Sequence, residues 1–111
     1  MIRIIVLVSL LAAPAFAEEN KEESCGYQAD VVAAIQKARL ARVKESNVEK
    51  VILADNPSWP ETYNAAIPEL TSWIYQQKRR DLRKVDLAAD LRTQCIENWD
   101  QIQEMQKGLK N

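Results

Sequence analysis

The chain contains only two cysteines, Cys25 and Cys95, which stand 70 positions apart. Two cysteines allow a single intrachain pairing, so one covalent bond would tie together both ends of the chain. Such a bond persists in an oxidising compartment, and the destination of the chain therefore decides whether it forms. We expect a Cys25–Cys95 disulfide. The alternatives are two free thiols or a bond between two chains.

The first 17 residues have the three parts of a secretory signal peptide. Arg3 gives a positive start, and residues 4–13 form an apolar run of ten. Pro14 ends this run, and Ala15 and Ala17 are the small residues that a cleavage site requires. A run of this length is too short to span a bilayer, which takes about 20 helical residues. We expect cleavage after Ala17 and a periplasmic or secreted product; the alternative is an uncleaved N-terminal anchor.

The mature chain predicted in this way, residues 18–111, has 94 residues and fits one small domain. Its 14 basic and 16 acidic residues give a net charge of −2, so overall charge makes no case for nucleic-acid binding. No second apolar run is long enough to cross a membrane. The acidic segment 18–24 contains no apolar residue and predicts a disordered lead-in to one domain over 25–111.

The pattern of apolar residues is helical. They recur at steps of three and four from Cys25 to Ile35, with Leu40 and Val43 beyond, and from Leu87 to Met105, and no alternating pattern exceeds four residues. With two glycines in the chain, tight β-hairpins would lack their usual turn residues. The sequence therefore predicts an all-α fold, a small bundle of four to five helices held by one disulfide.

Caps and prolines predict where these helices begin and end. We expect a first helix from Cys25 with Ser24 as its N-cap. Ser46 and Glu49 have the spacing of a capping box and predict a short helix to about residue 54. Pro68 predicts either a sharp kink or a separation between helices over 60–66 and 68–78.

The last helix is expected to follow Asp86, a good N-cap residue, and to end at Gly108. Its apolar residues lie on one long stripe: Leu87, Leu91, Cys95, Trp99, Ile102 and Met105.

Aromatic residues concentrate in the stretch 59–75, which contains Trp59, Tyr63, Trp73 and Tyr75. We expect this stretch, with Trp73 facing inward, to be the hub against which the first and last helices pack. Trp59, in a proline-containing loop, is the aromatic residue most expected to be partly exposed. Because tryptophan is enriched at binding hot spots, it is a candidate contact for a partner; the alternative is a purely structural core.

The chain lacks the parts of most active sites. It has no histidine, and both cysteines are expected to be oxidised, so we expect no metal and no cofactor. It has no glycine-rich phosphate loop, and a serine nucleophile would need an unusual base. Glu61 and Glu69 are the only carboxylates worth inspecting as a pair, but both are better explained by helix N-termini. We therefore predict no catalytic residue.

A basic run is the most distinctive polar feature, with five basic residues in seven: Lys78, Arg79, Arg80, Arg83 and Lys84. We interpret it as a connection with residual helix. It is a candidate contact for an anionic surface or an acidic partner. The alternative is a solvated helix end, where positive charge complements the helix dipole.

The tail Trp99-Asp100-x-Ile102, the small size and the single cysteine pair together resemble periplasmic acid-stress chaperones of the HdeA type. The cysteines here are further apart than in that family. The resemblance implies a helical domain that loosens at low pH and exposes apolar surface to client proteins.

Three functions follow from these expectations. The leading hypothesis is an exported, non-enzymatic domain that binds an unknown protein or an anionic component of the cell envelope. The second is a stress chaperone that acts by partial unfolding, and the third is a small carboxylate-based enzyme.

Overall fold

A computed structural model of the protein describes residues 20–110, with the side chains of Ile102 and of residues 106–110 left out. The predicted signal peptide and its cleavage site after Ala17 lie outside this range. Across the described residues the chain is all-helical, with no strand and with six α-helices and two 3-10 helices (η). In chain order these are α1 (Lys21–Leu40), η1 (Glu45–Asn47), α2 (Val48–Ala54), η2 (Glu61–Ala66), α3 (Ile67–Tyr75), α4 (Arg79–Leu82), α5 (Leu87–Glu97) and α6 (Trp99–Lys110). The all-α prediction is confirmed, although there are more helices than the expected four to five.

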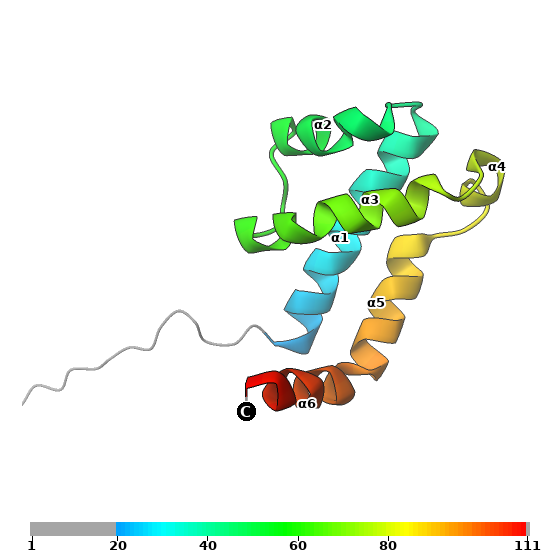
Figure 1. Ribbon diagram of the computed structural model, residues 1–111. Coiled ribbons are helices and arrows are strands. Elements are labelled where there is room, and N and C mark those ends of the chain that lie inside the picture. Colours follow the sequence, from blue (N-terminus) through cyan, green and yellow to red (C-terminus); the bar gives the residue numbers. More distant parts are fainter. Residues whose placement is uncertain (1–19, 111) are drawn as a thin grey trace, which may run out of the picture.

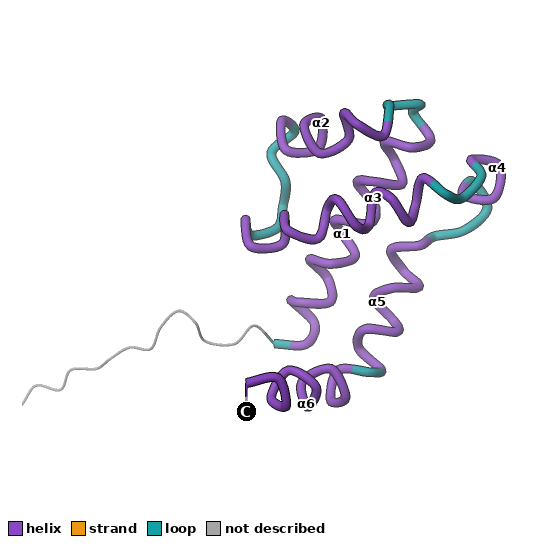
Figure 2. Tube along the Cα trace, viewed as in Figure 1, coloured by secondary structure: helices purple, strands orange, loops and turns teal. Residues whose placement is uncertain are grey.

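Two long helices, α1 and α5, lie side by side and antiparallel (Figure 1). The predicted disulfide is present and joins Cys25 near the start of α1 to Cys95 near the end of α5, with 5.6 Å between their Cα atoms. At the opposite end of this pair, α3 crosses α1, and α2 and α4 lie near the C-terminal turn of α1 (Figure 1). Figure 2 shows that short loops join the helices throughout the described chain.

The hydrophobic core is organised around α1 rather than around the aromatic stretch 59–75, and that prediction was wrong. Helix α1 contacts α2, α3, α4 and α5, and it contributes fully buried Val32 and Ile35 to the core. The stretch 59–75 supplies Ile67 and Ile74 from α3, which pack against α1 from one side. A helix of 20 residues with apolar side chains on more than one face can contact several neighbours at once.

Helix α1 begins four residues earlier than predicted. The side-chain oxygen of Asn20 accepts a hydrogen bond of 2.7 Å from the backbone N–H of Glu23, which makes Asn20 the N-cap. Ser24 is not a cap but a buried residue, and its Oγ accepts from the hydroxyl of Tyr63 at 3.1 Å. Residues 21–24, predicted to be disordered, are therefore helical. The acidic side chains that suggested disorder stabilise a first turn, because they face the positive end of the helix dipole.

The capping box predicted from Ser46 and Glu49 does not form. Ser46 lies in η1, and Asn47 occupies the cap position of α2 without a side-chain cap hydrogen bond. Pro68, by contrast, separates two elements, as one of our two alternatives predicted. It stands in the first turn of α3, where a missing N–H costs nothing, and the 3-10 helix η2 precedes it.

The predicted last helix is two helices. Its N-cap is confirmed, since Oδ1 of Asp86 accepts from the N–H of Ala89 at 3.0 Å. Asn98 then ends α5, and α6 turns away from α5 beyond it (Figure 1). The prediction that Gly108 ends the helix is also wrong, because α6 continues to Lys110.

One buried glutamine fixes the connection between α4 and α5 to the core. Nε2 of Gln36 donates to the carbonyl oxygens of Leu82 at 2.8 Å and Val85 at 3.0 Å. Its Oε1 accepts from the N–H of Leu87 at 3.3 Å. Backbone groups that no helix pairs are thus satisfied by a side chain of α1. This places the basic segment around α4 against the last turns of α1.

Candidate functional site

Two basic segments that are far apart in the sequence meet at one end of the bundle. Residues 39–45 form the last turn of α1 and the loop after it, and residues 78–84 include α4. Helix α4 contacts α1, and Figure 1 shows both at the same end of the molecule. We call residues 39–45 and 78–84 together the basic end. They contain eight basic and two acidic residues, whereas the rest of the chain has seven basic and fourteen acidic residues.

Arg39 is held in place by its neighbours at this end. Its guanidinium lies over the ring of Tyr75, 4.9 Å from the ring centroid, which is a cation–π contact. Its Nη2 donates to the backbone oxygen of Gln77 at 2.8 Å. The hydroxyl of Tyr75 donates in turn to the backbone oxygen of Val43 at 2.6 Å. Arg39 and Tyr75 therefore connect the end of α1 and the loop after it to the end of α3.

Arg42 has a strained backbone. The N–H of Val43 reaches back to the carbonyl of Ala38 at 3.0 Å, and Arg42 just before it has a φ of 67°. This is a Schellman-type helix end, at which glycine is the usual residue. A left-handed conformation costs a residue with a Cβ about 1–2 kcal/mol. The arginine side chain at this position is exposed to solvent.

Positive charges crowd one another at the basic end. The charge of Arg42 lowers the pKa of Arg79, with smaller contributions from burial and from the charges of Arg39 and Arg83. Among the side chains that the structure describes, the one ion pair is between Arg80 and Asp81, at 3.9 Å and largely exposed. The other guanidinium groups of this cluster therefore have no carboxylate partner in the described structure.

The basic run predicted as a connection with residual helix has that form. Lys78 precedes α4, while Arg83 and Lys84 follow it, and Leu82 is the side chain that turns into the core. The side chains of Lys78, Arg80, Arg83 and Lys84 are exposed. Sequence reasoning missed Arg39 and Arg42 as members of the same surface, because only the packing of α4 on α1 brings them there.

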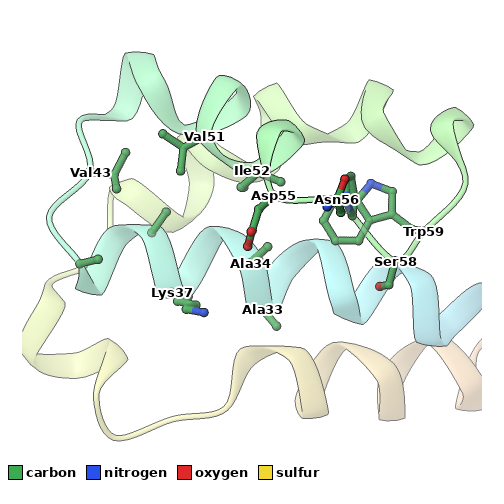
Figure 3. Close-up of a pocket in the computed structure, with 13 residues that line it drawn as sticks. Ala33, Ala34, Lys37, Val43, Val51, Ile52, Asp55, Asn56, Ser58 and Trp59 are labelled. Atoms are coloured by element: carbon green, nitrogen blue, oxygen red, sulfur yellow. The ribbon is translucent and has the colours of Figure 1, made fainter.

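Trp59 is not the exposed aromatic residue that we predicted. Its side chain is 8% exposed, and its Nε1 donates to Oδ1 of Asn64 at 2.8 Å. It lies at one end of an open groove of about 440 Å³ between α1 and α2, with Val43 and Val51 at the other end (Figure 3). Trp73, which we expected to face inward, is instead 49% exposed.

The structure does not bring Trp59 and the basic run together. The hydroxyl of Ser58, which precedes Trp59, donates to Oδ2 of Asp30 near the middle of α1. Arg39 stands nine residues further along that helix. At 1.5 Å per residue this separates the two positions by about 13 Å along the axis. The two candidate contacts therefore belong to different surfaces.

The two glutamates considered as a catalytic pair, Glu61 and Glu69, lie at the start of different elements, η2 and α3. Glu69 lines a second hollow of about 350 Å³ beside η2 and α3, but Glu61 does not line it. No group of three or more acidic or cysteine side chains within residues 20–110 is placed to hold a metal ion. No helix in that same range is long and apolar enough to cross a membrane.

Comparisons with known proteins add no family. No protein-family model matches the chain, and searches of curated proteins and of solved structures give no match either. The basic end itself is therefore the basis for proposing a function.

The Tyr75 contact makes stability depend on alkaline pH. Burial raises the pKa of Tyr75; the Arg39 charge partly offsets this, and Glu45 adds to it. The unfolded chain therefore loses this proton first, at a pH of about 10, and the folded protein at higher pH. The stability that comes from the raised pKa of Tyr75 is fully present below a pH of about 10 and is lost as the pH rises through the pKa of Tyr75 in the folded protein.

We expect the free energy of unfolding to fall as the pH rises above about 10, the ordinary pKa of tyrosine, and Tyr75→Phe to remove part of that fall. Urea unfolding at several pH values measures it. Tyr27→Phe, a change at a half-buried tyrosine of α1, is the control for the loss of a tyrosine hydroxyl. Identical pH profiles for the wild type and Tyr75→Phe would contradict this assignment.

Proposed function

We propose that the chain is an exported, non-enzymatic helical domain that binds an anionic macromolecule of the cell envelope through the basic end. The observation that carries this proposal is the charge asymmetry. More than half of the basic residues of the chain gather at one end, and the rest of the chain is strongly acidic. Such a distribution orients a protein toward a negatively charged surface and repels its other faces from that surface.

Export is supported by the disulfide, since such bonds persist in oxidising compartments. The leader pattern of the first 17 residues points the same way.

A chaperone that loosens in acid has less support. The buried polar side chains in the described core are Ser24, Gln36 and Thr71, and none of these ionises. Acid unfolds a protein chiefly by protonating carboxylates that are paired or hydrogen-bonded in the native state. The carboxylates with such partners here, those of Asp30, Asp81 and Asp86, are all exposed, so their protonation removes surface contacts and opens no buried site.

Sedimentation with envelope fractions tests the proposal. The variant Arg79→Gln/Arg83→Gln removes two charges from the basic end, and each is worth about 1 kcal/mol at an anionic surface. We expect binding to weaken about 30-fold, which is that energy converted at 1.4 kcal/mol per factor of ten. Binding of the wild type should also fall steeply as salt is added.

The matched control is Lys21→Gln/Arg92→Gln. It changes the net charge equally, but both residues lie toward the disulfide end of the bundle, on α1 and α5. We expect the control to bind like the wild type. Equal losses for the two variants, or no loss for either, would refute the assignment of binding to the basic end.

A further inference from the structure

We propose that Arg39, Arg42 and Arg79 form a binding site for a phosphate-type oxyanion. This inference rests on the proposed function and names the chemical group that the basic end recognises. Phosphate esters on a lipid headgroup or an envelope polymer share this chemistry with free phosphate.

The first support comes from donors without acceptors. Nε of Arg39 and Nε2 of Gln77 are buried nitrogens that have no hydrogen-bond partner. A hydrogen bond from Nη2 of Arg39 to the backbone oxygen of Gln77 joins the two residues. Both residues are half-buried, although the two nitrogens themselves are covered. Donors of this kind normally have a partner in a folded protein, and an oxyanion supplies acceptors only.

The second support is the position of Arg42. It occupies a left-handed conformation that glycine adopts without strain, directly after the helix that holds Arg39. Strain of this kind occurs preferentially at functional positions. The side chain it carries is exposed and is the strongest electrostatic neighbour of Arg79. Arg42 lies in the turn after α1 and Arg79 begins α4, and these two helices are in contact.

The third support is the choice of side chain. The groups that crowd here are guanidinium groups, from Arg39, Arg42, Arg79 and Arg83, rather than lysine ammonium groups. A guanidinium presents paired donors that match two oxygens of a phosphate, whereas an ammonium acts as a point charge. A phosphate monoester carries up to two negative charges, so one such group offsets the repulsion among several arginines.

The test compares anions at equal ionic strength. Purified oxidised protein labelled with ¹⁵N is titrated with inorganic phosphate and, separately, with acetate, while the Nε–H signal of Arg39 and the melting temperature are followed. We expect phosphate to shift the Arg39 signal saturably and to raise the melting temperature, and acetate to do neither. Equal responses to both anions would reduce the effect to charge screening and overturn the inference.

Arg42→Gly separates binding from folding. Glycine relieves the backbone strain, so this variant should melt at a higher temperature than the wild type without ligand. Its phosphate affinity should nonetheless fall at least tenfold. Unchanged affinity would overturn the role of Arg42. The control variant Lys21→Gln/Arg92→Gln should match the wild type in phosphate affinity.

Vesicles identify the source of the phosphate. Binding to phosphatidylglycerol vesicles but not to phosphatidylcholine vesicles, with displacement by free phosphate, would support the inference and assign it to a lipid headgroup. Phosphate binding without vesicle binding would support it and assign it to a soluble or polymer-borne phosphate. A protein that sediments with the envelope through the basic end but shows no phosphate response would overturn this inference and leave the proposed function standing.

Discussion

Loss of the Cys25–Cys95 disulfide is expected to lower the free energy of unfolding by about 4 kcal/mol. The bond closes a loop of 70 residues, and a crosslink over a loop of this length removes much of the freedom of the unfolded chain. It also joins α1 to α5 at the end of the pair opposite α3 and α4. At that end, α1 contacts η2 and α5 contacts α6, but both contacts are small compared with the contact between α1 and α5. Small domains are stable by only about 5–15 kcal/mol, so this loss is a large fraction of the total.

Urea unfolding of the double variant Cys25→Ala/Cys95→Ala measures this effect. The wild type in its oxidised form gives the reference, and the wild type treated with a reductant should match the variant. A control adds reductant to the double variant itself, which should change nothing. A difference below about 1 kcal/mol between the oxidised wild type and the variant would contradict the stabilising role of the bond.

The second large effect is expected at Gln36. In Gln36→Leu the side chain keeps its size but loses all three of its hydrogen bonds to the backbone. The carbonyls of Leu82 and Val85 and the N–H of Leu87 are then left without these partners, and each such group costs about 1–3 kcal/mol when buried. Because part of this connection is near solvent, we expect a total loss of about 2–4 kcal/mol.

The matched control for this substitution is Gln28→Leu on the same helix. Gln28 is half-buried and makes one side-chain hydrogen bond, to Oγ of Ser24 at 3.2 Å. We expect that change to cost less than about 1 kcal/mol. Equal losses at the two positions, measured by chemical unfolding, would show that the Gln36 network does not hold the α4–α5 connection in place.

Local signals in the sequence were sufficient for part of this fold. The helical period, the scarcity of glycine, the Asp86 cap and the position of Pro68 all act within a few residues, and each predicted its element. The disulfide was predictable because only one pairing exists. Asn20 is also a local signal for a helix start, but the acidic residues around it predict a disordered segment instead.

Features that depend on tertiary packing were not predictable. The apolar stripe from Leu87 to Met105 continues through Asn98, so its period does not reveal the break between α5 and α6. Trp59 and Trp73 exchanged their expected environments, because burial of an aromatic residue depends on which neighbours reach it.

The candidate site follows the same division. The run 78–84 is visible in the sequence as a block of charge, but Arg39 and Arg42 look like ordinary surface residues of an amphipathic helix. Their membership of the basic end depends on a contact between helices some 40 residues apart in the chain. No local pattern encodes that contact.

The most direct test of the account locates the bound partner on the protein. Oxidised ¹⁵N-labelled protein is titrated with a soluble anionic polymer, and the backbone amide shifts are mapped onto the structure. The account predicts that the shifts concentrate in the basic end, residues 39–45 and 78–84. Shifts that instead concentrate around the groove at Ala33, Ile52 and Trp59, with the basic end unmoved, would contradict it.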